Sequence, residues 1–132
     1  MIGIDTNVLV RYFAKDDPRQ TPIAVKFMRS LTKSAPGYIA LVTLAELAWV
    51  LKRKYQASRE QIGGILEGLL TAEELVVQEA VCAYRALGMY QRANISYADA
   101  LIAVGADMAG CARSVTFDRA AVAGAGMQLL KA

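Results

Sequence analysis

Four acidic residues of this sequence have surroundings that suit metal binding or catalysis: Asp5, Glu46, Asp99 and Asp118. Each stands inside or at the end of an apolar segment, whereas the other acidic residues lie among polar neighbours or near predicted helix ends. Carboxylates gathered in apolar surroundings repel one another, and unpaired buried charges are costly unless a cation offsets them or they take up protons. No Lys, Arg or His lies within the segments around Glu46 and Asp99, so a divalent metal is the cation that we expect there.

Histidine is absent from the sequence, which excludes Ser-His-Asp and Cys-His catalysis and every His-ligated zinc site. Cys82 and Cys111 are too few for a disulfide framework and lack metal-ligand spacing, so we expect both to be small buried residues in a reducing compartment. Ligation by carboxylate oxygens alone favours the hard ions Mg²⁺ or Mn²⁺. Such a metal lowers the pKa of a bound water and polarises a phosphoryl oxygen, while a carboxylate not bound to it can accept a proton.

Each of these acids can also have a purely structural role instead of binding a metal. Glu46 and Asp99 occupy the last position of Thr43-x-x-Glu46 and Ser96-x-x-Asp99. A carboxylate at this position can close a capping box or favour the helix dipole, and do nothing more. The other two acids can be turn-forming residues. It is the joint pattern of the four that favours a shared metal site.

The charge balance points to a polyanionic substrate. The chain carries 15 basic and 12 acidic residues, a net charge of +3. Without the four singled-out acids, 15 basic residues face 8 acidic ones, a balance of +7. An acidic metal site within a basic surface suits a nucleic-acid phosphodiester. The candidate contacts to a nucleic-acid backbone are Arg11, Lys52, Arg53, Lys54, Arg113 and Arg119. For each of them alone, an ordinary solvated surface charge is the alternative.

Length and composition predict one globular domain over residues 1–132. Apolar residues make up 55% of the sequence and charged ones 20%, which excludes intrinsic disorder. No linker, repeat or low-complexity tract divides the chain. The longest near-apolar stretch, Ala35–Leu51, contains Pro36, Gly37 and Glu46, so we expect no membrane span. The first residues include no basic segment or cleavage site, and we expect a cytoplasmic protein.

Short apolar strands alternate with helices, which indicates an α/β fold with a parallel sheet. The predicted strands are Ile2–Ile4, Tyr38–Val42, Leu75–Val77, Ala112–Val115 and Met127–Leu130. The predicted helices are Val8–Ala14, Asp17–Leu31, one starting at Thr43, one starting at Ser58, Glu79–Arg92 and Ser96–Ala109. For the second of these helices, Thr21-Pro22 offers an alternative start one turn after Asp17-Pro18. Ligand sites in such sheets gather at the carboxyl ends of the strands, where the following helices also begin. We therefore expect the four carboxylates to converge on one rim.

Four motifs carry a family resemblance. They are Asp5-Thr6-Asn7-Val8-Leu9-Val10-Arg11, Glu46 at a helix start, Tyr97-Ala98-Asp99-Ala100-Leu101-Ile102-Ala103 and Val115-Thr116-Phe117-Asp118-Arg119. In this order and spacing the sequence resembles the PIN-domain ribonucleases, specifically the VapC toxins of bacterial type II toxin–antitoxin systems. The resemblance covers essentially the whole chain. The four motifs together are far more specific than the opening heptad alone.

The resemblance implies a three-layer α/β/α fold with a central parallel sheet of about five strands, and an endoribonuclease activity that depends on Mg²⁺ or Mn²⁺. It implies that the acidic metal-binding and catalytic residues are Asp5, Glu46, Asp99 and Asp118. Asn7 and Thr116 would orient those carboxylates, and Thr6 would help through its backbone or hydroxyl. Arg11 and Arg119 are the basic residues nearest to these motifs and are candidates for RNA binding.

The resemblance also implies partners: an RNA substrate, a second copy in a homodimer, and a cognate VapB-like antitoxin whose tail covers the active-site groove. The high apolar content fits such a protein–protein surface. One departure stands out, because many relatives continue after Asp118-Arg119 with another acid and an aromatic residue. Here Ala120-Ala121-Val122 follows, which puts an extra ligand from this loop in doubt. Asp107, near a predicted helix end, is expected to point to solvent.

Two other functions compete with this one. A phosphatase of the haloacid-dehalogenase type expects Asp-x-Asp after its first strand, but Asn7 stands in the second place and no catalytic Lys motif is evident. A PIN-like module that binds RNA or a protein partner without cutting is the non-enzymatic alternative. The presence of all four acids argues against it.

Overall fold

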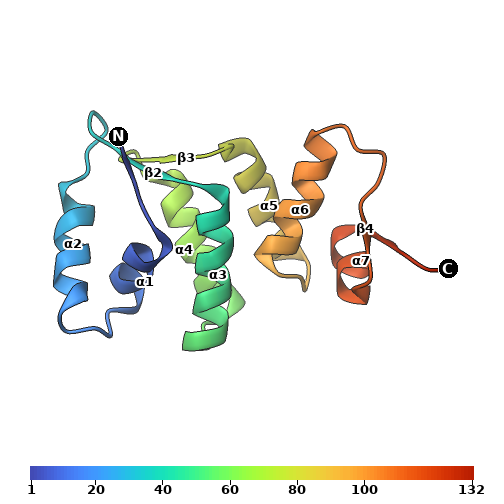
Figure 1. Ribbon diagram of the computed structural model, residues 1–132, viewed down its shortest axis with the longest axis horizontal. Helices are drawn as coiled ribbons and strands as arrows, with labels where there is room; N and C mark the ends of the chain where they lie inside the picture. The colour runs from blue at the N-terminus through green and yellow to red at the C-terminus, as the bar shows by residue number, and fades with distance from the viewer.

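The computed structural model describes residues 1–132, along which helices and strands alternate (Figure 1). The strands are β1 (Ile2–Gly3), β2 (Gly37–Ile39), β3 (Leu75–Val77), β4 (Val115–Thr116) and β5 (Gln128–Leu129). The helices are α1 (Thr6–Ala14), α2 (Gln20–Ser30), α3 (Leu41–Tyr55), α4 (Arg59–Thr71), α5 (Ala80–Arg92), α6 (Tyr97–Met108) and α7 (Arg119–Ala125). The predicted α/β class is confirmed. No helix combines the length and apolar character that spanning a bilayer would require.

The strands form two parallel sheets. β2 lies between β1 and β3 in a three-stranded sheet, with Gly37 opposite both Ile2 and Leu75. β4 pairs only with β5, with Val115 opposite Gln128. The predicted strands are all present and all parallel, but they are divided into sheets of three and two, because β1 does not pair with β4.

The last three elements lie apart from the three-stranded sheet. We call Val115–Leu129, which holds β4, α7 and β5, the C-terminal unit. It lies beyond α6, at the end of the molecule opposite α2 (Figure 1). Ala121 and Met127 are buried within it, and Gly124 lies so close to Ile95 that a β-carbon there would clash. The unit is therefore anchored by packing on the α5–α6 side of the chain.

The core is formed mainly by helices. Leu9, Leu44, Leu47 and Leu66 are fully buried, and they come from α1, α3 and α4. Tyr97 at the start of α6 is also buried, and its hydroxyl donates a hydrogen bond to the Ala83 carbonyl of α5 at 2.9 Å. This packing fixes the beginnings of α1, α3 and α6, which carry three of the four acids singled out in the sequence.

Most predicted elements are present, with shifts at their ends. α2 begins at Gln20, between the two predicted starts at Asp17 and Thr21. The Asp17 carboxylate nevertheless accepts hydrogen bonds from the backbone N–H groups of Arg19 and Gln20 at 2.9 and 2.7 Å. The predicted start of α4 is confirmed, because Ser58 and Gln61 form a reciprocal capping box. α7 was not predicted, since its seven residues are too few to show a periodic pattern.

The start of α3 was predicted at Thr43 and lies at Leu41 instead. The Leu41 N–H donates to the side-chain amide oxygen of Gln78 at 3.0 Å. A side chain 37 residues away thus satisfies a backbone donor that a local cap would otherwise have to satisfy. A partner so distant in sequence leaves no local signal, which explains the misplaced start.

The two cysteines differ in environment. Cys82 is buried in α5 as predicted, and burial raises the pKa of its thiol. Cys111 is exposed, so the prediction of a buried residue was wrong for it. It lies in the loop between α6 and β4, outside the buried core.

Candidate active site

A hydrogen bond joins the opening motif to α3. Asp5 follows β1 and is the N-cap of α1, with extended backbone angles. Thr6, the first residue of α1, is buried, and its hydroxyl donates to Oε1 of Glu46 at 2.8 Å. This contact places Glu46 beside the turn that carries Asp5. The carboxyl end of β1 and the N-terminal half of α3 therefore share one site.

The capping explanation for Glu46 is wrong. Because α3 begins at Leu41, Glu46 lies in the second turn of the helix, beyond the reach of a residue that closes a capping box. Thr43 is inside the helix rather than at its N-cap. The Glu46 carboxylate is exposed, and the hydrogen bond that it makes to a side chain is the one from Thr6.

Asp99 lies at the start of α6. Its backbone N–H donates to the Ser96 hydroxyl at 3.0 Å, so Ser96 caps the helix as predicted. No hydrogen bond returns from the Ser96 N–H to the Asp99 carboxylate, which leaves this half-buried carboxylate without a capping partner. A groove of about 160 Å³ runs between α3 and the beginning of α6, with Ala45 and Trp49 on one side and Ala98 on the other. Glu46 and Asp99 thus lie on neighbouring helices.

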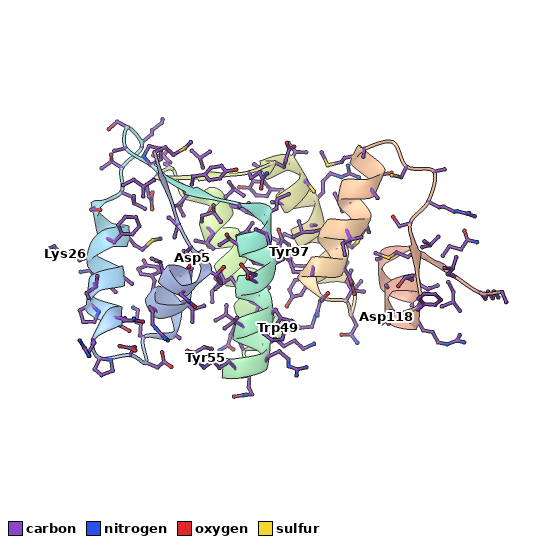
Figure 2. All side chains as sticks on the ribbon, in the orientation of Figure 1. Asp5, Lys26, Trp49, Tyr55, Tyr97 and Asp118 are labelled. Carbon is purple, nitrogen blue, oxygen red and sulfur yellow. The ribbon has the colours of Figure 1, made fainter.

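Asp118 is in a different place. It is the N-cap of α7, and its Oδ1 accepts a hydrogen bond from the Ala120 N–H at 2.9 Å. Its own N–H donates to the Thr116 hydroxyl at 2.9 Å, so Thr116 contacts the backbone of Asp118 and not its carboxylate. Figure 2 shows Asp5 beside α1 and Asp118 at the other end of the molecule. The turn-forming role that the sequence left open for Asp118 is the one that the structure shows.

The predicted convergence of all four acids on one rim is not found within the single chain. Asp5 and Glu46 share a site, Asp99 lies on the adjoining helix, and Asp118 belongs to the distant C-terminal unit. No three acidic or sulfur-bearing side chains lie close enough together to hold a metal ion. The donor chemistry suits Mg²⁺ or Mn²⁺, but the arrangement within one chain does not complete a metal site.

The remaining candidates have varied surroundings. Asn7 is exposed and lines a groove of about 490 Å³ beside β1, together with Ile2, Ile23 and Phe27. Arg119 is exposed at the start of α7 and takes part in no ion pair. Asp107 forms an exposed ion pair with Arg85 at 2.8 Å; its predicted exposure is confirmed, and Arg85 accounts for its charge.

Arg11 is held within the protein. Its Nε donates to the Gln20 side chain at 2.6 Å, and its guanidinium lies 3.8 Å from Asp16 and 3.9 Å from Asp17. Hydrogen bonds from the backbone N–H of Gln20, then of Arg19, and the nearby Arg11 charge lower the pKa of Asp17. These acidic neighbours offset the charge that Arg11 would offer to a phosphate.

Two features near the site were missed in the sequence. Trp49, the single tryptophan of the chain, is 62% exposed on α3, and the Arg53 guanidinium lies 5.6 Å from its ring centroid. An aromatic residue three positions after a candidate catalytic acid is the signal that could have revealed it. The second is Gln78, whose contact with Leu41 has no sequence signature.

A third groove, larger than the two described above, has mainly apolar walls. Its volume is about 710 Å³, and its lining side chains include Tyr12, Phe13, Met28, Tyr55 and Leu69. The buried Tyr55 hydroxyl has no hydrogen-bond partner there, and desolvation raises its pKa. The sequence had predicted an apolar surface for a partner without locating it.

Comparisons with known proteins identify the family of the chain. The family model described as PIN domain matches residues 2–125, which include all four acids. No curated protein sequence matches the chain. A crystal structure of FitAcB from Neisseria gonorrhoeae is similar at 19% sequence identity and a TM-score of 0.37, covering 99% of this chain and 97% of that one. Because the family model spans nearly the whole sequence, from β1 through α7, the chain belongs to the PIN-domain family.

Proposed function

We propose that this PIN domain is an endoribonuclease dependent on Mg²⁺ or Mn²⁺, and the toxin of a VapC-like type II toxin–antitoxin system. The observation that carries the proposal is the hydrogen bond from Thr6 to Glu46. It links two motifs that are 40 residues apart and sets a carboxylate beside Asp5 at the carboxyl end of a parallel strand. In open α/β folds, sites form at this edge.

The proposal gives each residue a role. Asp5, Glu46, Asp99 and Asp118 are the acids that would hold the metal and handle protons. Thr6 orients Glu46, while Asn7 and Thr116 support the acids next to them in sequence. A bound divalent ion would supply positive charge that offsets carboxylate repulsion and polarises a phosphoryl oxygen. Arg119 and, less strongly, Arg11 are proposed to contact the RNA backbone.

The proposed partners follow from charge and apolar surface. The balance of +7 outside the four acids suits RNA phosphates. The groove lined by Tyr12, Phe13 and Met28 offers apolar surface for one segment of an antitoxin, whose tail would cover the groove at the acidic site. We propose that the protein acts in the cytoplasm, is inhibited there by its VapB-like antitoxin, and forms a homodimer.

The test is RNA cleavage by the purified protein with Mg²⁺ or Mn²⁺. We expect cleavage with either metal, loss of cleavage with EDTA, and loss with Asp5→Asn, which keeps the side-chain size and removes the charge. Glu67→Gln, a change of an exposed acid on α4, is the matched control and should cut like the wild type. Cleavage that survives both EDTA and Asp5→Asn would refute the mechanism.

A second function is supported by one observation. Because no three acids come together within the chain, it could be a PIN-like module that binds RNA or a partner without cutting. Isothermal titration with Mn²⁺ separates the two functions. The nuclease should bind Mn²⁺ and lose affinity on Asp99→Asn, whereas a binding module should show no such dependence.

A further inference from the structure

Two strands of this chain have free edges that match each other. β1 pairs only with β2: the N–H groups of Ile2 and Ile4 donate toward that strand, to Pro36 and Tyr38. Peptide groups alternate in direction along a strand, so those of Gly3 face the open edge. An edge of this kind is a template for another strand.

β4 also has a free edge, because it pairs only with β5. The carbonyls of Ser114 and Thr116 accept hydrogen bonds from β5, both at 2.8 Å, which leaves the peptide groups of Val115 toward the open edge. The side chains near the two edges are apolar and uncovered. Ile2 is 55% exposed, and Phe117 at 79% is the most exposed large apolar side chain of the protein.

The two candidate acids, Asp5 and Asp118, follow β1 and β4 after the same number of residues. Asp5 stands two residues after the end of β1, and Asp118 stands two residues after the end of β4. Neighbouring strands in a sheet lie about 4.8 Å apart. If β4 paired in parallel with β1, Asp118 would therefore come beside Asp5. A pairing through β5 would not have this effect, because Lys131 stands two residues after the end of that strand.

The chain's own β4 is not placed to do this. The C-terminal unit is packed on the α5–α6 side through α7, which contacts α6 and whose Gly124 lies tightly against Ile95. β1 lies on the other side of α3 from it (Figure 1). Moving the unit to β1 of the same chain would require that packing to be broken, whereas a second copy can present β4 without any such change.

We propose that a second copy of this chain pairs its β4 with the free edge of β1, so that each acidic site takes Asp118 from the partner. The resulting sheet has the order β3-β2-β1 followed by the partner's β4 and β5. Phe117 of the partner supplies a large apolar side chain for the groove of about 490 Å³ beside β1. Reciprocal pairing gives a closed two-fold dimer with two sites. The inference rests on the proposed function in assigning Asp5 and Asp118 to one site.

Cross-linking tests the interface without activity. Ile2→Cys and Val115→Cys are the suitable pair, because the register that sets Asp118 beside Asp5 also puts Val115 opposite Ile2. The two side chains are 55% and 49% exposed, for Ile2 and Val115 respectively. Both variants also carry Cys111→Ser. Mixed and oxidised, they should form a covalent heterodimer. Val76→Cys, on the opposite edge strand β3, replaces Val115→Cys in the control and should not cross-link to Ile2→Cys. The proposal is overturned if no heterodimer forms, if Val76→Cys cross-links equally, or if one chain with both cysteines closes the bond within itself.

Complementation tests the shared site. Asp5→Asn and Asp118→Asn should each abolish RNA cleavage, and an equal mixture after subunit exchange should regain about one quarter of the wild-type rate. Half of the mixed dimers are heterodimers, and each of these holds one site with both acids intact. No recovery, with an active wild type, would overturn the shared site. If the wild type itself does not cut RNA, the proposed function fails, and the cross-linking still decides whether β1 and β4 pair between chains.

Discussion

The Thr6 hydroxyl donates a 2.8 Å hydrogen bond to Glu46, and through it the turn after β1 is joined to α3. The donor is buried and the acceptor carboxylate is exposed, so the bond fixes one oxygen of Glu46 and leaves the other open. A hydroxyl in this position orients a carboxylate without adding charge. Glu46 is thereby held at the turn that carries Asp5.

Removing this hydroxyl should impair cleavage more than stability. Thr6→Val keeps the shape and deletes the donor; we expect RNA cleavage to fall about 10- to 100-fold, as for other residues that orient metal ligands. The free energy of unfolding should fall by about 1 kcal/mol. Thr6→Ser should restore most of the activity. Thr43→Val, at the other buried threonine, is the control, because Thr43 donates no hydrogen bond to a carboxylate. Equal losses in both valine variants would contradict the orienting role.

The two roles of Asp118 can be separated by two substitutions. Its carboxylate caps α7 through the Ala120 N–H, and asparagine can make the same bond without the charge. We expect Asp118→Asn to keep the stability and lose RNA cleavage. Asp118→Ala should lose both, with a decrease of about 1 kcal/mol in the free energy of unfolding. Urea denaturation and a cleavage assay measure the two effects. An active Asp118→Asn variant would show that Asp118 only caps α7.

Arg119 should contribute more to RNA binding than Arg11. Arg119 is in no ion pair, whereas Arg11 lies within 4 Å of Asp16 and Asp17. Binding of a single-stranded RNA is measured in EDTA at several salt concentrations. Arg119→Ala should reduce the slope of log affinity against log salt by about 0.7, the value of one phosphate contact. Arg11→Ala should change it less. The opposite ranking would place the RNA beside α1 and α2 instead.

Tyr97 should make the protein sensitive to alkali. Burial, and to a smaller extent the nearby Cys82, raises the pKa of Tyr97 above that of a free tyrosine. The unfolded chain releases this proton near pH 10 while the folded chain keeps it, so the stability is complete below that pH and declines above it. Urea denaturation from pH 8 to 11 should show this decline, and Tyr97→Phe should make it shallower. Part of the decline should remain, because burial also raises the pKa values of Tyr90, Tyr55 and Cys82.

The control for this measurement is Tyr84→Phe. The Tyr84 hydroxyl also donates to a backbone carbonyl, that of Leu70 at 2.8 Å, but its side chain is 44% exposed. We expect the alkaline decline of this variant to match the wild type. If the stability of Tyr97→Phe fell with rising pH as steeply as that of Tyr84→Phe, the assignment of the alkaline decline to Tyr97 would be contradicted.

Local signals in the sequence predicted the elements well. β3 lies at the predicted residues, and Ser58 and Ser96 begin their helices as expected, because a capping hydroxyl acts within three residues of its partner. The start of α3 was missed, because its first N–H is satisfied by Gln78 from a distant turn. The exposed Cys111 was missed because the packing of its loop is not encoded by neighbours in sequence.

The sequence alone limited the chemistry that is available, because a chain without histidine and with two separate cysteines offers a metal only oxygen ligands. The sequence also determined the α/β class, through its alternating apolar strands and helices. Only the tertiary structure decided which acids meet. Thr6 and Glu46 come together through the packing of α1 on α3, while Asp118 is carried away by the C-terminal unit on α6. The physical reason is range: capping and periodicity act over a few residues, whereas the convergence of side chains depends on how strand edges pair and helices pack.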